Sequence, residues 1–253
     1  MSELSGKVAI ITGASKGIGE AAARHMASLG TKVILAARSE KAVTKIAGEI
    51  IREGGEAIGI TCDVGEYDQV KAVVDVAVKT FGSIDILVNN AGLIDPISRL
   101  EDSKPEEWDM VVDVNVKGVY YGIHAVLPHM KKVGSGVIIN ISSGAATSAL
   151  EGWSHYCASK AAAYSITRCT HVEEAANGIR VVGLSPGTVA TDMQVAIKAS
   201  GINPVSELDP SVHIPPDWVA QTIAWLATDD ARPFDGDDVS LRDPEIRSRV
   251  GVG

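Results

Sequence analysis

The residues with the clearest capacity for chemistry lie in the segment 154–160, where Tyr156 and Lys160 are four positions apart. On a helix, that spacing places both side chains on one face. A phenol has a pKa of about 10, which makes it a poor proton donor or acceptor near neutrality. Because an adjacent ammonium favours the phenolate, we expect Lys160 to lower the pKa of Tyr156. Tyr156 would then exchange a proton with a carbonyl or an alcohol.

Ser143 and Asn115 are two further candidates. The apolar run GVIINIS leads into Ser142 and Ser143, which places hydroxyls at the carboxyl edge of an expected parallel strand, where open α/β sheets bind ligands. A hydroxyl there can hold a substrate oxygen that gains negative charge, or it can cap the turn after the strand. Asn115 falls within a helical stretch, where asparagine is unfavourable, so we expect a compensating hydrogen bond.

A glycine-rich turn separates the first expected strand from the first expected helix. It reads Gly13-Ala-Ser-Lys-Gly17-Ile-Gly19. Glycines let the backbone approach a pyrophosphate closely, and the amino terminus of a helix adds free N–H groups with partial positive charge. Together with its position between strand and helix, the turn predicts a dinucleotide-binding site.

The end of the second expected strand, VILAARSE, bears on the choice of dinucleotide. A carboxylate there would bind the ribose 2′-hydroxyl and repel a 2′-phosphate, but this sequence has Ala37 followed by Arg38. A guanidinium can pair with a phosphate, and Lys16 offers a second positive charge. We therefore expect NADP(H) in preference to NAD(H). The alternative is that both cations are solvated surface charges.

These residues must be positioned by short β-branched runs that alternate with longer helical segments. The pattern is typical of a parallel sheet with helices on both faces. It predicts one α/β domain over 1–253 with a doubly wound, Rossmann-type sheet and right-handed crossovers. The expected strands are 7–12, 32–37, 57–61, 84–89, 136–142 and 179–185, and the expected helices are 17–29, 40–53, 68–81, 105–131 and 155–176.

The pattern weakens after the sixth strand. Residues 188–216 contain several prolines and no strand period, and we interpret them as a mobile substrate lid. A helix over about 217–228 and a short strand near 238–241 are expected to close the fold, followed by a polar tail.

Composition excludes several classes of partner. The formal net charge of −9 argues against nucleic acid or an anionic membrane surface. No run of apolar residues is long enough to span a membrane, and the first residues lack the core of a signal peptide, so we expect a cytoplasmic protein. The 3 cysteines form no CxxC pair, which argues against a disulfide framework or a metal site.

Over roughly residues 6–191, these motifs resemble the short-chain dehydrogenase/reductase family. TGASKGIG is similar to the TGxxxGxG turn of that family, and NNAG, DVNVKG, the Tyr-x-x-x-Lys pair and SPGTVAT follow in the family's order. The resemblance implies hydride transfer between a nicotinamide and a carbonyl or alcohol. It selects Ser143 over Ser142 to polarise the substrate oxygen, makes Tyr156 the proton donor, and assigns Asn115 to position a water beside Lys160.

The same resemblance implies a set of cofactor contacts. Asp63 would bind the adenine, Lys160 the nicotinamide ribose, and Thr191 the carboxamide. The full predicted set is Gly13, Ser15, Lys16, Gly17, Ile18, Gly19, Arg38, Asp63, Val64, Asn89, Ala91, Gly92, Tyr156, Lys160, Pro186, Gly187 and Thr191.

Family members assemble as dimers or tetramers through two long helices, here near 105–131 and 155–176, so we expect a homo-oligomer. The chain ends in FDGDDVSLRDPEIRSRVGVG, which departs from the TGQ-x-x-x-V-DGG of the family and puts any interface at that end in doubt.

The substrate class is read only coarsely, as a ketone or aldehyde of modest polarity. Apolar residues that flank the motifs are candidates for its pocket: Leu93, Ile94, Ala145, Leu150, Trp153, Met193 and Val195. His155 and Glu151 could add polar contacts.

Two other functions compete with this reading. A serine hydrolase that uses Ser143 lacks a G-x-S-x-G elbow in this sequence. A non-catalytic dinucleotide-binding redox sensor or scaffold would keep the glycine turn but would not need the four catalytic candidates.

Overall fold

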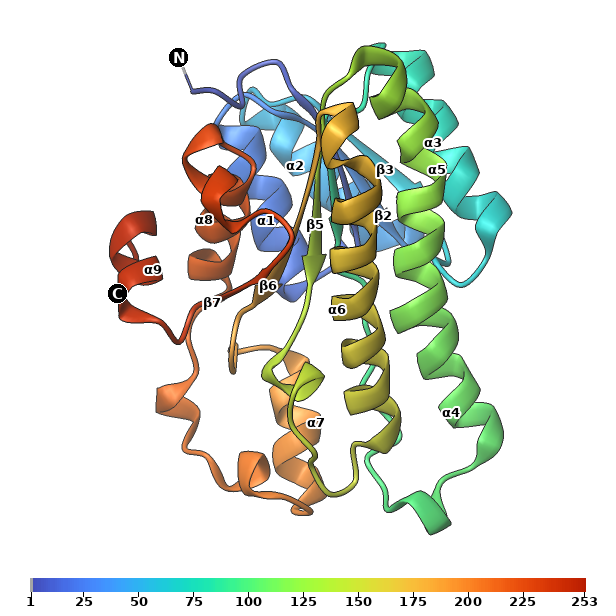
Figure 1. Ribbon diagram of the computed structural model, residues 1–253, viewed down its shortest axis with the longest axis vertical. Helices are drawn as coiled ribbons and strands as arrows, with labels where there is room; N and C mark the ends of the chain where they lie inside the picture. Colours follow the sequence, from blue (N-terminus) through green and yellow to red (C-terminus); the bar gives the residue numbers. More distant parts are fainter. Residues whose placement is uncertain (1) are drawn as a thin grey trace.

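The computed structural model describes residues 2–253, whose strands form one parallel sheet (Figure 1). The strand order is β3-β2-β1-β4-β5-β6-β7. After β3 the chain crosses back past β1 to form β4, and ligands of doubly wound sheets bind at such a point of reversal. The predicted doubly wound fold is therefore confirmed. The strands are β1 Val8–Thr12, β2 Lys32–Ala37, β3 Ala57–Thr61, β4 Ile86–Asn89, β5 Gly136–Ile141, β6 Ile179–Ser185 and β7 Asp238–Ser240.

Helices cover both faces of this sheet, and Figure 1 shows the sheet nearly edge-on between them. One face carries α1, α2, α8 and α9, and the other carries α3, α5 and α6. None of the helices in residues 2–253 is long and apolar enough to cross a membrane. Their bounds are α1 Gly17–Ser28, α2 Glu40–Arg52, α3 Tyr67–Phe81, α4 Pro105–Val112, α5 Gly118–Val133, α6 Ser154–Glu174, α7 Asp192–Ser200, α8 Pro216–Leu226 and α9 Pro244–Val250.

The central strands are largely apolar because each is buried on both faces. In β1, Ala9 and Ile11 belong to the core under α1 and α8, whereas Val8 and Ile10 belong to the core under α3 and α5. Alternate side chains of a strand point to opposite faces, so a strand between two helical layers has no polar side.

The expected helix over 105–131 is divided into three parts. A π-helical turn, Asp113–Lys117, separates α4 from α5 and contains Asn115. Turns of this kind add one residue to the helix and are frequent at functional sites. The sequence marks the place only by an asparagine in an otherwise helical pattern.

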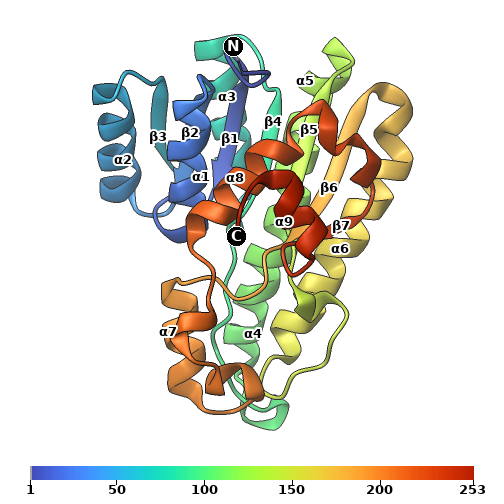
Figure 2. The same cartoon turned by 90° about the vertical axis from the view of Figure 1, so that its left-hand side faces the viewer.

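The carboxyl-terminal third is more structured than the sequence suggests. Residues 188–216 contain α7, which the proline-rich pattern had hidden, and a bridge between Val189 and Ile214 joins the two ends of the segment. Figure 2 places α7 beyond the carboxyl ends of the strands.

The expectation of a polar tail after β7 is wrong. Residues after Leu241 form α9, which Asp243 caps by accepting a hydrogen bond from the Glu245 amide at 2.8 Å. Ile246 and Val252 are buried in the core shared with α1 and α8. Because Ile246 is the one buried apolar residue within this helix, periodicity could not reveal it.

Candidate active site

A cleft of about 1060 Å³ lies beyond the carboxyl ends of the central strands. It brings together most of the residues singled out from the sequence, although they come from segments far apart in the chain. Those that line it are Gly13, Ser15, Lys16, Gly17, Ile18, Arg38, Asp63, Val64, Ala91, Gly92, Ser143, Tyr156, Lys160, Pro186, Gly187 and Thr191. Three others, Gly19, Asn89 and Asn115, lie behind its wall.

The glycine turn forms one end of the cleft. Gly13 and Gly17 have φ values of 64° and 57°, in the left-handed region that glycine adopts without strain. A Cβ at Gly13 would lie 2.8 Å from the Cα of Ala91, so the turn packs directly on the segment after β4. No side chain caps the start of α1, where Lys16 is the N-cap residue. Its first N–H groups are therefore available to an anionic group, which fits a pyrophosphate.

Gly19 has a packing role behind the turn. A Cβ at this position would overlap the carbonyl oxygen of Gly13 and lie 2.6 Å from Nδ2 of Asn90. Asn90 donates from that nitrogen to the carbonyls of Thr12 and Gly13 at 2.9 and 3.2 Å. Gly19 therefore permits the close contact between helix and turn, and does not line the cleft as predicted.

Asn89 is the second residue that lies away from the predicted position. As the last residue of β4 it is buried under α5, and it donates to Oδ1 of Asn140 in β5 at 2.9 Å. Gly122 of α5 leaves room for its side chain. Alternation along the strand turns the next residue, Asn90, toward the cleft.

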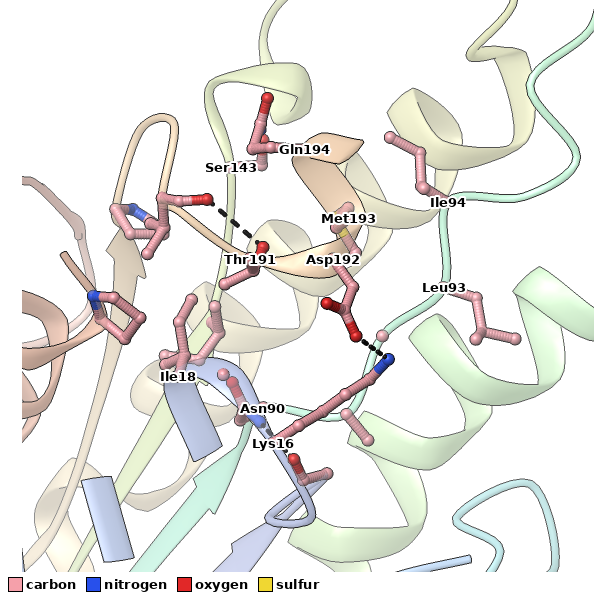
Figure 3. Close-up of a pocket in the computed structure, with 18 of the residues that line it drawn as sticks. Lys16, Ile18, Asn90, Leu93, Ile94, Ser143, Thr191, Asp192, Met193 and Gln194 are labelled. Atoms are coloured by element: carbon pink, nitrogen blue, oxygen red, sulfur yellow. Dashed lines mark hydrogen bonds and ion pairs between the residues drawn. The ribbon is translucent and has the colours of Figure 1, made fainter. Parts of the chain in front are cut away.

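Just after β2, Arg38 is exposed on the cleft wall and has no ion-pair partner among residues 2–253. Lys16 does not join it. Its Nζ lies 2.7 Å from Oδ2 of Asp192, and Figure 3 shows Lys16 extending from the glycine turn toward the start of α7. A phosphate must compete with Asp192 for Lys16, so Arg38 is the readily available cation.

Tyr156 and Lys160 meet on the buried face of α6. Nζ of Lys160 lies 5.7 Å from the centroid of the Tyr156 ring and donates to the carbonyl of Ile141 at 2.7 Å. Ser143 follows β5, and its hydroxyl both interacts with the Tyr156 phenol and accepts a hydrogen bond from the amide of Ala145 at 3.2 Å. The catalytic and turn-capping interpretations of Ser143 are therefore compatible.

Burial sets the ionisation of this pair. It raises the pKa of Tyr156 to about 12, although the hydrogen bond with Ser143 partly opposes the rise. Burial also lowers the pKa of Lys160 to about 8, against the opposing effect of the Asp238 carboxylate. The expected lowering of the Tyr156 pKa is not found in this structure, because desolvation of the phenolate is the largest influence on that pKa.

Asn115 in the π-helical turn is buried and fully engaged. Its Oδ1 accepts from the Leu93 amide at 2.8 Å, and its Nδ2 donates to the Leu93 carbonyl at 2.8 Å and to Oγ of Ser159 at 3.0 Å. This is the compensating bonding expected for a helical asparagine. The carboxamide fixes the chain after NNAG against α6, and a role in positioning water beside Lys160 stays a prediction.

Apolar residues surround the phenol. Ile94, Ala145, Trp153, Tyr156 and Ile197 form a hydrophobic cluster separate from the two main cores. The rings of Trp153 and Tyr156 meet edge-on, with 5.5 Å between centroids. Figure 3 shows Leu93 and Ile94 on the segment after β4 and Met193 at the start of α7. The predicted pocket residues Leu93, Ile94, Ala145, Leu150, Trp153 and Met193 all line the cleft.

Three of the suggested pocket residues do not line the cleft. Val195 is 70% exposed, because Met193 and Ile197 occupy the face of α7 that turns inward. His155 is fully buried and its Nε2 lies 2.6 Å from the carbonyl oxygen of Ile94, so it serves packing. Glu151 is exposed, and Oε1 of its carboxylate lies 3.5 Å from Nε of Arg99.

Comparison with known proteins agrees with this geometry. The model of the short chain dehydrogenase family matches residues 7–200, from the start of β1 to the end of α7. The protein belongs to this family. The match includes the glycine turn and the Tyr-x-x-x-Lys pair but ends before the departure at the carboxyl terminus.

Individual members of the family differ in their reactions. The chain is 38% identical to a 3-oxoacyl-[acyl-carrier-protein] reductase from Synechocystis sp. over 236 residues, which cover 92% of this chain and 94% of the relative. It is 32% identical to a cyclohexanol dehydrogenase from Acinetobacter sp., with 90% of each chain covered. The family match and these relatives show that this short-chain dehydrogenase is an oxidoreductase.

Solved structures of the family superpose along nearly the whole chain. An NAD⁺-bound xylitol dehydrogenase has a TM-score of 0.88 at 26% identity and covers 95% of this chain and 99% of its own. A levodione reductase has a TM-score of 0.88 at 28% identity, with 94% and 97% covered.

Sequence reasoning missed several residues of the cleft. Ile197 and Val205 line it from the segment interpreted as a lid, and Arg242 lines it from the loop before α9. The four-residue spacing of Met193 and Ile197 could have indicated α7. Arg242 lies in the stretch that departs from the family pattern, so no motif pointed to it.

Proposed function

We propose that this short-chain dehydrogenase is an NADP(H)-dependent reductase of ketones or aldehydes. One observation carries the proposal: Ser143, Tyr156 and Lys160 line the same cleft as the glycine turn, next to an apolar cluster. A dinucleotide whose pyrophosphate is bound at the turn would then bring its nicotinamide to a carbonyl substrate that contacts Tyr156.

The cleft fits the cofactor at three points. The uncapped amino terminus of α1 suits the pyrophosphate, and Arg38 suits a 2′-phosphate because no carboxylate pairs with it in the described chain. Lys160 suits the nicotinamide ribose, since its ammonium is held beside Gly92 at the cleft wall. When bound, the reduced nicotinamide supplies a hydride to the carbonyl carbon.

The side chains of the chain divide the remaining work. Ser143 donates a hydrogen bond to the carbonyl oxygen as negative charge develops on it. Tyr156 transfers its phenolic proton to the same oxygen, and Lys160 stabilises the phenolate that results. Asn115 holds Leu93, and with it the cleft wall, in place.

The raised pKa of Tyr156 favours reduction. At neutral pH the phenol keeps its proton, which is the form that reduction needs, whereas oxidation of an alcohol would need the phenolate. The apolar cluster around the phenol favours an aliphatic ketone, and the cyclohexanol dehydrogenase and levodione reductase that resemble this chain suggest cyclic ones.

A substrate panel with a matched pair of variants tests this function. Purified protein is mixed with NADPH or NADH and with cyclic, linear and aromatic ketones, aldehydes and a 3-oxoacyl thioester. Tyr156→Phe should lower kcat by about 1000-fold or more while NADPH still binds, because only the proton donor is lost. Tyr164→Phe is the control, since Tyr164 is a half-buried tyrosine on the same helix whose hydroxyl donates to Asp237 and does not line the cleft.

Three results would contradict the proposal. Substantial turnover by Tyr156→Phe would mean that another group donates the proton. Equal use of NADH and NADPH would remove the role of Arg38. Tight NADPH binding with no turnover on any compound would favour the redox sensor or scaffold.

The proposal also includes a lid over the cleft and an oligomeric state. Residues 188–216, with α7 at their centre, act as a lid, and the ion pair of Lys16 with Asp192 supports a closed position. The protein forms a homo-oligomer, which is supported by exposed apolar side chains on the long helices, including Met110, Tyr120 and Val172. Light scattering on the purified protein measures the oligomeric state.

A further inference from the structure

One carboxylate, that of Asp238, lies on the face of the sheet that α6 covers, and none of the sequence motifs described above includes it. Asp238 is the first residue of β7, the edge strand, and pairs with Gly183 of β6. Its Oδ1 is buried and has no well-formed hydrogen bond within residues 2–253. A buried carboxylate without full compensation is costly, so its presence calls for an explanation.

Gly183 makes room for this carboxylate. A Cβ at Gly183 would overlap Oδ1 of Asp238, so the carboxyl group lies across β6 in the space that a side chain would otherwise fill. Gly183 in turn pairs with Asn140 of β5. Asn140 donates to Thr167 of α6 at 2.9 Å, which places this row of residues on the face of the sheet that α6 covers.

Lys160 belongs to the same face. It projects from α6 and its Nζ donates to the carbonyl of Ile141, the residue after Asn140 in β5. The Asp238 carboxylate raises the pKa of Lys160, and the Lys160 ammonium lowers that of Asp238. Burial nevertheless raises the pKa of Asp238 to about 6, and the adjacent Asp237 contributes to the rise.

The other polar groups around Asp238 carry no positive charge. The Ser142 hydroxyl lowers the pKa of Asp238 more than Lys160 does, but it is neutral, and its buried oxygen has no well-formed hydrogen bond within residues 2–253. Tyr164 of α6 donates to Asp237 at 3.2 Å, outside the buried space. Lys160 is therefore the only cation that acts on Asp238 from the elements packed against it in the described chain.

We propose that Asp238 is a positioning residue for Lys160: its carboxylate, in the space left by Gly183, keeps the Lys160 ammonium charged at the pH of catalysis. The inference rests on the proposed role of Lys160 at the nicotinamide ribose. Asp238 does not line the cleft and acts through the lysine. It adds a role for β7, in the stretch that departs from the family pattern.

The effect has a distinctive pH dependence. Asp238 is neutral below about pH 6, so it exerts its effect only above that value. Lys160 loses its proton near pH 8. Removal of the Asp238 charge should therefore leave NADPH binding unchanged at pH 5.5 and should weaken that binding progressively above pH 7. If Asp238 had a purely structural role, its replacement would weaken NADPH binding at every pH.

The test titrates Lys160 in the intact protein. The chemical shift of its ¹³Cε is followed from pH 5.5 to 10 in wild type and in Asp238→Asn, with assignment by Lys160→Arg. The midpoint should fall by about one pH unit, as expected for loss of a nearby opposite charge. Asp237→Asn is the matched control and should titrate close to wild type, because Asp237 is exposed.

Cofactor binding provides the functional measurement. The dissociation constant of NADPH, followed by its fluorescence, should be equal for wild type and Asp238→Asn at pH 5.5. At pH 8.5 it should be about five- to tenfold higher in the variant, the decrease in the charged fraction of Lys160 for a shift of about one unit. Gly183→Ala, which displaces the carboxylate, should change both titrations in the same direction.

The outcomes separate the two proposals. If Lys160 titrates with the same midpoint in Asp238→Asn as in wild type, the role of Asp238 is overturned, whether or not the enzyme turns over. An equal shift in Asp237→Asn overturns it too, because any nearby charge would then suffice. A shifted midpoint with unchanged NADPH binding at pH 8.5 refutes the proposed contact of Lys160 with the ribose instead.

Discussion

Replacement of Lys160 by methionine should stabilise the fold while it abolishes turnover. Lys160 is buried at the cleft, and its pKa falls from 10.5 to about 8. Each unit of pKa is worth about 1.4 kcal/mol, so holding the ammonium in this site at pH 7 costs about 3 kcal/mol. Methionine fills a similar volume without charge.

Part of the stability gained by removing the buried charge is offset by lost interactions. The carbonyl of Ile141 loses the hydrogen bond from Nζ, at a cost of about 1 kcal/mol, and Asp238 loses its opposite charge. We therefore expect Lys160→Met to be more stable than wild type by about 1–2 kcal/mol at pH 7. For a chain of this length, that raises Tm by roughly 2–8 °C.

The pH dependence identifies the cause. A pKa that is lowered on folding means that the folded state gains stability as pH rises from the folded value of about 8 toward the unfolded value of 10.5. Wild type should therefore gain about 2 kcal/mol relative to the variant between pH 7 and pH 9.5, which removes most or all of the difference expected at pH 7. Urea denaturation at both pH values measures it.

Lys41→Met is the control, because Lys41 is exposed on α2. It should change stability by less than about 0.5 kcal/mol at either pH. The reasoning is refuted if Lys160→Met is less stable than wild type at pH 7 by the same amount as at pH 9.5. That result would mean that lost packing, and not desolvation of a charge, dominates at this position.

Two further predictions concern the cofactor end of the cleft. Ala37→Asp places a carboxylate beside Arg38, so the Kd of NADPH should rise at least about tenfold while that of NADH falls; fluorescence titration that finds NADPH binding unchanged would place the 2′-phosphate elsewhere. Gly19→Ala brings a Cβ onto the carbonyl oxygen of Gly13, and should cost about 1–3 kcal/mol in urea denaturation and abolish NADPH binding. Gly48→Ala on α2, where a Cβ meets nothing within 4 Å, should be neutral or slightly stabilising, and a similar loss there would argue against the packing explanation.

Local patterns in the sequence determined the doubly wound sheet. Uninterrupted apolar runs such as that of β1 are characteristic of strands buried on both faces, and helices of regular period separate them. Right-handed crossovers restrict how such strands can be arranged, and the structure supplied the order itself. The α7 helix and α9 escaped detection because few of their residues are buried, and periodicity weakens when the apolar face is narrow.

The sequence also determined which residue types gather at the cleft, because motifs follow fixed positions at strand ends. The Tyr156 and Lys160 pair needs only the period of a helix, and the glycine turn needs only the junction of strand and helix. Both line one cleft in the structure. The sequence did not predict the directions of neighbouring side chains correctly. Asn89 was expected at the cofactor, but it faces the core, and Asn90 faces the cleft.

Only the tertiary structure decided the ionisation of the site. Burial of the phenol and the ammonium opposes the simple attraction between them, and the depth of burial depends on every element packed around α6. It also decided that Lys16 meets Asp192, a residue far along the chain, and that Asp238 lies on the side of the sheet that holds Lys160. Desolvation and long-range charge contacts arise from packing in three dimensions, and the order of residues along the chain does not contain them.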